Sequence, residues 1–533
     1  MSTVPQSSLV PQDNTSIPTT PATSTYDEVP YGSYPVPASH PDRLYSMAKL
    51  FGMEPVPPEN ARILEIGCAG GGNLLPMASM FPNADCVGVE LSQVQCEYGS
   101  EAIKFTDFKN ASIKQGSVTD IDASFGKFDY ILCHGVFSWV PEFVREAILR
   151  VSSENLSDQG IAFISYNALP GWYMRGMIRG MMIEHVRQIE EPIQKIAQAR
   201  ALLRYLVDSN ANVNTPHAIF LRSEAELLAK MPDSYILHEH LEDTNQAFYF
   251  RDFVTMAAKF NLQFLGEASI ASTWAGNLSA EAQKGLNPIN DAISRGHYMD
   301  CITGRTFRET YLVKSSTKVD RNLEDGRLMP IRFSGKFETV NDSNVTDGST
   351  SYKLKNGQII HTTDPIVKCA LEVLTSVYPE SRTAAEVVTE LATRKVQFDS
   401  REQTVNKVLS TLVHGVLGGW VEFRFLPDRM QSKISARPQA TKWARVQALA
   451  NKYITNQKHE FIRIDDAQRQ IIPMLDGTRT LEDIISEVSV LLSTGLLKVS
   501  ITGNIDSREI PKMVVSQVLM QLAQNSVLLP EAA

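Results

Sequence analysis

The sequence lacks the features that mark membrane and exported proteins. No apolar run in its 533 residues reaches the ~18 residues that a membrane-spanning helix requires. No Lys or Arg precedes Arg43, so the N-terminus has neither the basic start of a secretory signal nor the Arg-rich character of a transit peptide. We therefore expect a cytoplasmic protein without a membrane span.

Paired cysteines and an excess of positive charge are also missing. The six cysteines are scattered and form no CxxC pair, which predicts buried thiols in a reducing compartment rather than metal ligands or disulfides. The formal net charge of -9 argues against binding to nucleic acid or to an anionic membrane by charge alone. We therefore expect neither a metal site nor a nucleic-acid partner.

The chain is long enough for several domains. Residues 1–25 are rich in Ser, Thr, Pro and Gln with few apolar anchors, which predicts a disordered tail. Changes of pattern divide the remainder into an α/β domain (26–180), a mostly helical middle domain (181–325) and a C-terminal α+β region (326–533).

The α/β domain alternates apolar strands with helical stretches. We expect strands at 62–66, 86–90, 111–115, 128–133 and 160–165. This alternation predicts a doubly wound parallel sheet with right-handed crossovers.

The C-terminal region begins with alternating segments around Asn356-Gly357, a strong signal for a β-hairpin. Amphipathic helical patterns follow, and TRTLEDIISEV (478–488) echoes SRTAAEVVTEL (381–391). The echo favours a tandem of small winged-helix-like units. The alternative is two unrelated helices, each started by a Thr cap.

The stretch RILEIGCAGGGN (62–73) runs from a strand into a glycine-rich loop. Such a loop before a helix points backbone N–H groups and the positive end of the helix dipole into a crevice at the carboxyl edge of the sheet. We expect Asn73 to cap the helix and Pro76 to lie in its first turn. The loop also satisfies a loose G-x-A-x-x-G, so a dinucleotide site has to be considered.

Two acids favour a different cofactor. Glu65 lies just before the loop, where it would repel the pyrophosphate of a nicotinamide or flavin cofactor, whereas S-adenosylmethionine offers an ammonium and a sulfonium cation. Glu90 ends the next strand, where a carboxylate can accept both ribose hydroxyls. For Glu90 the alternative is an exposed acid that closes a strand. Together with the glycines, the two acids predict S-adenosylmethionine as the cofactor.

Two further segments end in the same crevice. GSVTDID follows the third strand and makes Ser117, Val118 and Asp120 candidates for reading the adenine edge. FDYILCHGVFSWVP places His134 at the end of the fourth strand, facing the methionine moiety or the substrate. A purely structural histidine is the alternative.

Together, RILEIGCAGGGNLL, GVELS, QGSVTD and FDYILCHGVFSWVP resemble the class I methyltransferases, whose seven-stranded sheet binds S-adenosylmethionine. Three flanking stretches and the segment ARVQALANKYITNQKHEFIRID are similar to bacterial methyltransferases with a methyltransferase regulatory domain: YDEVPYGSYPVPASHPDRL, SYNALPGWYMRGMIRGMM and HEHLEDTNQAFYFRDFVTMAAKFNLQFLGEA. The resemblance implies a protein-lysine methyltransferase of the kind that acts on outer-membrane proteins. It also implies a catalytic domain, a helical middle domain and a C-terminal winged-helix-like domain.

The cofactor positions of this family carry over to six residues: Glu65, Gly67, Ala69, Gly71, Glu90 and Asp120. Their neighbours Cys68, Asn73 and Leu91 join them as cofactor-binding candidates. Ala69 replaces the usual middle glycine, which is compatible with a tight turn if its φ is negative. Ser117 stands where an Asp often reads adenine.

Methyl transfer from a sulfonium needs an aligned lone pair and a dry site rather than a covalent nucleophile. Tyr166 and Asn167, at the exit of the fifth strand, are candidates for orienting an amine, and His134 and Trp139 complete the predicted catalytic set. We expect the middle and C-terminal domains to dock a protein substrate, such as an outer-membrane protein; a homodimer is compatible with the sequence. One alternative is methylation of a small molecule. The other, from a different functional class, is DNA binding by winged helices, which the basic stretch 433–458 favours.

Overall fold

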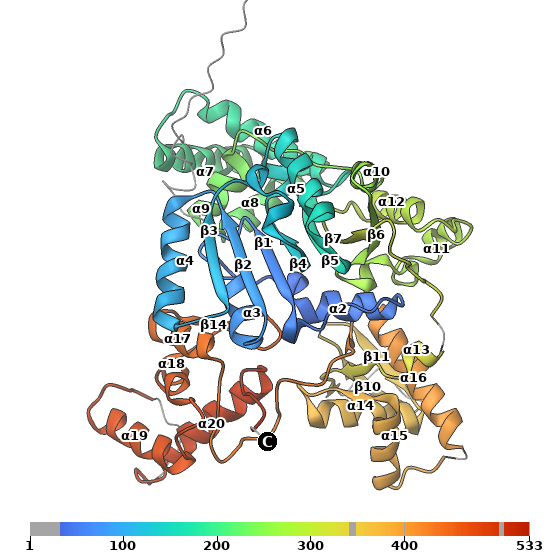
Figure 1. Ribbon diagram of the computed structural model, residues 1–533, viewed down its shortest axis with the longest axis vertical. Helices are drawn as coiled ribbons and strands as arrows, with labels where there is room; N and C mark the ends of the chain where they lie inside the picture. Colours follow the sequence, from blue (N-terminus) through green and yellow to red (C-terminus); the bar gives the residue numbers. More distant parts are fainter. Residues whose placement is uncertain are drawn as a thin grey trace, which may run out of the picture.

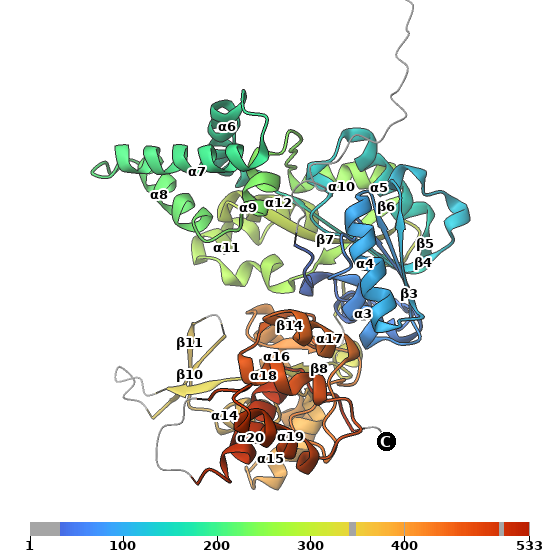
Figure 2. The same cartoon turned by 90° about the vertical axis from the view of Figure 1, so that its left-hand side faces the viewer.

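The computed structural model of the chain describes residues 32–323, 325–340, 348–355, 357–398, 400–499 and 506–531. The predicted tail at 1–25 and Asn356 of the predicted hairpin turn lie outside these ranges. Figure 1 shows a central sheet with helices on both faces, and Figure 2 shows the C-terminal region, yellow to red, packed below it. Within the described ranges, every helix is too short or too polar to cross a bilayer.

A seven-stranded sheet forms the centre of the fold. Its strand order is β3-β2-β1-β4-β5-β7-β6, and β7 runs antiparallel to both of its neighbours while the other pairs are parallel. This order confirms the predicted doubly wound sheet of the class I type. The strands are β1 (Arg62–Ile66), β2 (Asp85–Glu90), β3 (Ala111–Gln115), β4 (Phe128–Cys133), β5 (Leu156–Asn167), β6 (Leu262–Glu267) and β7 (Phe307–Lys314).

Helices cover both faces of the sheet because its central strands are apolar on both sides. The face formed by Ile63, Tyr130 and Phe163 packs against the N-terminal helices and the first C-terminal unit. The opposite face, with Leu64 and Ile164, packs against the later helices. The first set is α2 (Pro41–Leu50), α3 (Leu74–Met80) and α4 (Gln93–Thr106), and the second is α5 (Glu142–Glu154) and α10 (Phe250–Lys259).

The last two strands of the sheet come from far along the chain. Both β6 and β7 belong to the segment predicted as the middle domain, 181–325, so the predicted boundary at residue 180 does not coincide with the end of the sheet. Between β5 and α10 the chain forms a helical bundle with its own apolar core, at the top of Figure 1. Its helices are α6 (Trp172–Val186), α7 (Pro192–Ser209), α8 (Pro216–Leu228), α9 (Asp233–Tyr235) and a π-helical turn (Ile236–Leu241).

After α10 and β6, two helices lead into β7. They are α11 (Ala280–Leu286) and α12 (Ala292–Thr303), and a short helix, α13 (Asp325–Leu328), follows β7.

The C-terminal region contains two units of helices and short strands. The first shares its apolar core with the sheet, and the second has a core of its own. Helices α15 and α19 both begin with a capping box, Thr383 with Glu386 and Thr480 with Asp483, at the two stretches whose sequences echo each other. The first unit comprises β8 (Arg332–Ser334), β9 (Glu338–Val340), β10 (Thr350–Lys353), β11 (Ile359–Thr362), α14 (Pro365–Val377), β12 (Arg382–Thr383), α15 (Ala384–Thr393), α16 (Arg401–Leu417) and β13 (Glu422–Arg424). The second comprises α17 (Lys442–Ala450), β14 (Tyr453–Thr455), β15 (Phe461–Arg463), α18 (Asp466–Ile471), α19 (Leu481–Ser493) and α20 (Ile510–Gln524).

Candidate active site

The loop after β1 has a left-handed backbone at three positions. Gly67 has a φ of 71°, Gly71 a φ of 80° and Ala69 a φ of 46°. A Cβ on Gly67 would lie 2.6 Å from Cγ2 of Val136, so only glycine fits there. The condition of a negative φ at Ala69 is not met, and its left-handed backbone costs roughly 1–2 kcal/mol relative to the right-handed form.

The end of β2 holds this strained turn. One carboxylate oxygen of Glu90 accepts the N–H of Ala69 at 2.9 Å, and the other accepts the N–H of Ser92 at 2.9 Å. Glu90 therefore sits beside the glycine-rich loop, as predicted from its position at a strand end. The next residue, Leu91, is 65% exposed and offers an apolar surface beside the carboxylate.

Glu65 is buried under the same loop, with 4% of its surface exposed. Its Oε1 accepts the side-chain N–H of Asn73 at 2.7 Å, while Oε2 is buried without a hydrogen-bond partner in the described part of the chain. Burial, reinforced by the charge of Glu90, raises the pKa of Glu65 to about 8 although the Asn73 hydrogen bond lowers it. An unsatisfied buried oxygen beside a glycine cradle suits a cationic ligand group.

The side chain of Asn73 does not cap α3 as predicted but binds distant segments of the chain. It lies at the N-cap position of α3, but its side chain makes no capping hydrogen bond. Instead, Oδ1 accepts the N–H of Val36 at 2.8 Å and contacts Nε2 of His459 at 2.6 Å. The predicted cap was therefore wrong, because long-range partners take the side chain that would have capped the helix. Through Glu65, Asn73 still contacts the predicted cofactor site.

Cys68 lies in the loop but turns its side chain away from the crevice. Its Sγ would be 2.4 Å from a Cβ on Gly88, so the thiol packs against β2. Its backbone N–H bonds to the carbonyl of Val89 at 3.3 Å. Cys68 can therefore contribute backbone to the site, while its thiol belongs to the core.

The C-terminal region reaches this loop through the β14–β15 hairpin. His459, in the turn of that hairpin, is fully buried and lies 386 residues from Asn73 in sequence. Burial lowers its pKa to about 3, so it is neutral and donates from Nε2. The rings of Tyr453 and Phe461 on the hairpin lie 5.7 Å from that of Tyr34 in the N-terminal segment. Sequence reasoning missed His459, because nothing near it in the sequence points to the glycine-rich loop.

The predicted adenine-reading residues form a compact turn after β3. Ser117 and Asp120 make a capping box, in which Asp120 accepts the N–H of Ser117 at 3.3 Å. Asp120 is exposed, whereas Val118 packs in the core with only 7% of its surface exposed. A Cβ on Gly116 would meet nothing within 4 Å, so the entrance to this turn is open.

His134 lies at the end of β4 on the same face as Glu65. Its ring stacks on Phe163 at 6.0 Å and meets Phe307 edge-on at 5.9 Å. Burial lowers its pKa to about 4, and its Nδ1 is buried without a hydrogen-bond partner among the described residues. A neutral imidazole does not repel a sulfonium cation, which suits the predicted position beside the methionine moiety.

The structure separates the other predicted catalytic residues. Tyr166 is 1% exposed and stacks on Phe253 at 3.9 Å, with its hydroxyl on Thr310 at 3.3 Å. Asn167, the next residue, points to the face of His134, because neighbouring strand residues alternate. Its Nδ2 is buried without a partner among the described residues. Asn167 thus lies with His134, while the Tyr166 ring lies in the opposite core.

Trp139 lies in a short helical turn after β4 and packs against the middle domain. It is 9% exposed, and its ring meets that of Trp172 edge-on at 6.2 Å. Trp172 is held in turn by Asn245, whose Oδ1 accepts the indole N–H at 2.8 Å. These contacts account for the ring as part of the wall behind the crevice, and its catalytic role stays a prediction.

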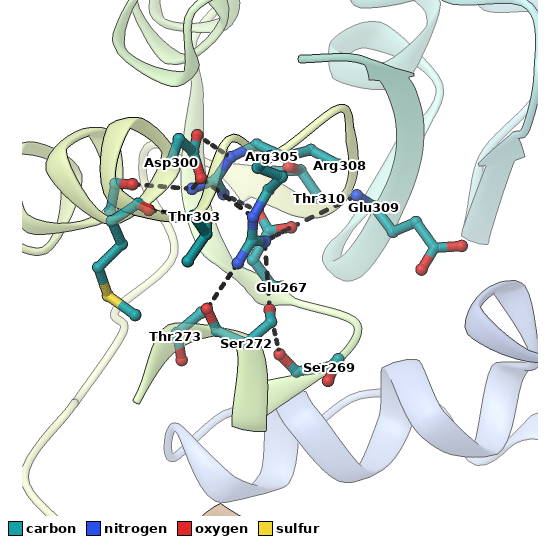
Figure 3. Close-up of polar contacts among 12 residues, drawn as sticks. Glu267, Ser269, Ser272, Thr273, Asp300, Thr303, Arg305, Arg308, Glu309 and Thr310 are labelled. Carbon is teal, nitrogen blue, oxygen red and sulfur yellow. Dashed lines mark hydrogen bonds and ion pairs between the residues drawn. The ribbon is translucent and has the colours of Figure 1, made fainter. Parts of the chain in front are cut away.

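A buried network of charges holds β7 in place (Figure 3). The guanidinium of Arg308 bonds to Glu267 at 2.6 Å and to Asp300 at 2.8 Å, and lies 3.6 Å from the ring centroid of Phe250. Arg305 adds a second cation, 3.0 Å from Asp300. Two acids and two arginines therefore balance, which joins β6, β7 and α12 into one block.

The crevice fits the predicted S-adenosylmethionine. A Cβ on Gly116 or on Gly135, at the ends of β3 and β4, would meet nothing within 4 Å. Between them lie the glycine cradle, the carboxylate of Glu90 and the orphan oxygen of Glu65. Open space, an acceptor for hydroxyls and an acceptor for an ammonium occur in the order that the cofactor would need.

Three protein families match successive parts of the chain. Residues 63–160 match "Methyltransferase domain", residues 232–314 match "Predicted methyltransferase regulatory domain", and residues 436–527 match "PKMT, C-terminal winged helix domain". The first match covers the glycine-rich loop, and the second includes β6 and β7, which complete the sheet.

Relatives match over nearly the whole length. Protein RP789 of Rickettsia prowazekii (strain Madrid E) is 36% identical over 496 residues, covering 91% of this chain and 89% of that protein. The structure of PKMT2 from Rickettsia typhi has a TM-score of 0.84 and 32% identity, covering 94% of this chain and 100% of that one. The same protein in complex with AdoHcy matches with a TM-score of 0.84 and 33% identity. The chain therefore belongs to the S-adenosylmethionine-dependent methyltransferases of class I that combine a methyltransferase regulatory domain with the PKMT C-terminal winged-helix domain.

Proposed function

We propose that this methyltransferase transfers methyl groups to lysine amines of a protein substrate. The observation that carries the proposal is the His459–Asn73 contact, in which a C-terminal domain shared with PKMT2 reaches the loop of the cofactor site. An enzyme for small metabolites needs the sheet and a lid. Here, the β14–β15 hairpin of the second C-terminal unit contacts the glycine-rich loop, and the helical bundle packs against Trp139. These additional domains offer surface for a folded partner.

The chemistry places clear demands on the residues around the acceptor. S-adenosylmethionine supplies an electrophilic methyl group on a sulfonium. Deprotonating a lysine amine with an ordinary pKa of ~10.4, which frees its lone pair, costs about 4–5 kcal/mol at pH 7. The ring of Phe307, which lies beside His134 and is 37% exposed, offers an apolar surface that favours the neutral form of an incoming amine. Neutral His134 adds no positive charge to this environment.

The test is to identify the methylated atom. The purified enzyme is incubated with isotopically labelled S-adenosylmethionine and a bacterial lysate, and both proteins and metabolites are analysed by mass spectrometry. We expect the label on lysine side chains of proteins. At low cofactor concentration a Glu90→Gln variant should transfer roughly tenfold less, because it removes the charge proposed to face the ribose. Glu146→Gln, which changes an exposed acid on α5, should transfer as the wild type does. Label confined to metabolites would refute the proposal and favour the small-molecule alternative.

Three further proposals accompany this function. An outer-membrane protein is the proposed acceptor, docked by the middle and C-terminal domains, and it can be tested by adding purified outer-membrane proteins to the same assay. A homodimer and action in the cytoplasm are the other two. Sedimentation of the purified chain and fractionation of cells test them.

A further inference from the structure

On the face of the sheet that carries His134, residues of β1, β4, β5 and β7 pair side by side and form rows across the strands. Glu65 pairs with Leu132, Leu132 with Phe163, and Phe163 with Tyr311. Because strand residues two apart share a face, the next row lies on the same side of the sheet.

In that next row, Ser165 of β5 pairs with Glu309 of β7, and one step further Asn167 pairs with Phe307. The hydroxyl of Ser165 accepts the N–H of Gly135 at 2.9 Å, which ties this row to the loop after β4. In the sheet, β1, β4 and β5 therefore separate Glu309 on β7 from Glu90 on β2.

Glu309 is the unpaired acid of β7. Figure 3 shows its carboxylate pointing away from the Glu267 network, to which it is joined only by its backbone N–H. Among the described residues, the half-buried carboxylate makes no hydrogen bond or ion pair, whereas Glu267 and Arg308 on the neighbouring positions are fully paired. Burial and the charge of Glu267 raise the pKa of Glu309, and the exposed Arg43 opposes them.

Two other polar atoms on this face also lack partners. Nδ2 of Asn167, which is 2% exposed, and Nδ1 of His134 are both buried without a hydrogen-bond partner in the described residues. Buried polar groups normally have partners, and exceptions often mark a ligand site. A separate hollow of about 440 Å³ lies between α12 and the turns at residues 270–277 and reaches only Phe307, at the end of the row.

We propose that the carboxylate of Glu309 forms the binding site for the protonated amine of the methyl acceptor. This inference rests on the proposed function and assigns the amine a binding partner rather than a base. The carboxylate first holds the ammonium against repulsion from the sulfonium, which favours the charged form of the amine. The proton then leaves to solvent, and the neutral amine turns its lone pair to the methyl group. A neutral or anionic acceptor would gain nothing from Glu309, so the site selects amines.

The test uses butylammonium, which mimics the end of a lysine side chain, and its neutral analogue 1-butanol. Each is titrated into the full-length protein saturated with AdoHcy, and binding is measured by saturation-transfer NMR. We expect the wild type to bind butylammonium at least tenfold more tightly than 1-butanol. Glu309→Gln should remove this preference, Glu309→Asp should restore part of it, and Glu146→Gln should leave it unchanged.

Calorimetry with AdoHcy separates a local effect from a folding defect. All variants should bind AdoHcy within about twofold of the wild type, because Glu309 lies outside the predicted cofactor contacts. Equal binding of butylammonium and 1-butanol by the wild type would overturn the inference without any variant. Equal butylammonium binding by wild type and Glu309→Gln would also overturn it. In the methylation assay, an unchanged KM in Glu309→Gln would remove this inference alone, whereas the absence of lysine methylation by the wild type would remove the proposed function.

Discussion

Replacing Glu65 by Gln should stabilise the cofactor-free protein while weakening its hold on the cofactor. Glu65 is buried, and burial raises its pKa to about 8, with Glu90 adding to the effect and the Asn73 hydrogen bond opposing it. Glutamine keeps the acceptor for the Asn73 side chain but never ionises. The substitution therefore isolates the cost of a buried carboxylate.

The size of the effect follows from proton linkage. In the unfolded chain, Glu65 ionises near its ordinary value of 4.5, whereas the folded chain keeps the proton up to about pH 8. Between these values the folded state binds more protons, so this group lowers stability as pH rises. At pH 7 the difference amounts to about 3 kcal/mol, and it vanishes below about pH 4.5. We expect Glu65→Gln to gain up to this amount at pH 7 and nothing at pH 4.

Whereas Glu65→Gln should raise the stability of the free protein, it should lower the affinity for the cofactor. If the cofactor ammonium ionises Glu65, AdoHcy binding at pH 7 releases about 0.9 proton, because only about a tenth of the group is ionised in the free protein. The variant should release none and bind about tenfold more weakly, as it loses a charge-assisted hydrogen bond.

Urea unfolding at pH 4 and 7 measures the stability difference, and calorimetry in buffers of different ionisation enthalpy counts the released protons. Glu146→Gln, an exposed acid on α5, is the matched control and should change neither quantity. A variant no more stable than the wild type at pH 7 would refute the argument from burial. Proton release that persists in Glu65→Gln would assign the linkage to another group.

The remaining predictions concern the structure around the site. His459→Phe removes the hydrogen-bond donor to Asn73 and should weaken AdoHcy binding, measured by calorimetry, by about 1–3 kcal/mol. The control His217→Phe, at an exposed histidine, should leave the affinity unchanged. Equal affinities of wild type and His459→Phe would contradict the link between the C-terminal domain and the loop. Arg308→Met leaves the buried acids Glu267 and Asp300 with one cation fewer and should lower the free energy of unfolding, measured in urea, by about 3–5 kcal/mol. A loss below 1 kcal/mol would contradict this prediction. Glu90→Gln should weaken AdoHcy binding roughly tenfold and lower the free energy of unfolding by about 1–3 kcal/mol, because one of the two backbone N–H groups loses its acceptor. Unaltered affinity would argue against the ribose assignment.

The sequence by itself determined the local pieces of this protein. The expected strands at 62–66, 111–115 and 128–133 have the same bounds in the structure, because each is a short segment between turn residues. The glycine-rich loop and the acids Glu65 and Glu90 are also local, since a strand end and the following turn lie within a few residues. These signals suffice for the cofactor class.

Only the tertiary structure decided what surrounds those pieces. The sheet is completed by β6 and β7 after a long helical excursion, and the side chain of Asn73 bonds across 386 residues to His459 instead of capping its helix. Glu309 joins the row beside Ser165 only through the antiparallel pairing of β5 with β7. Pairings of this kind depend on how distant segments pack, and packing leaves no periodic or compositional trace in either segment alone. For that reason the cofactor class could be predicted from short sequence segments, whereas the proposed amine site at Glu309 required the folded chain.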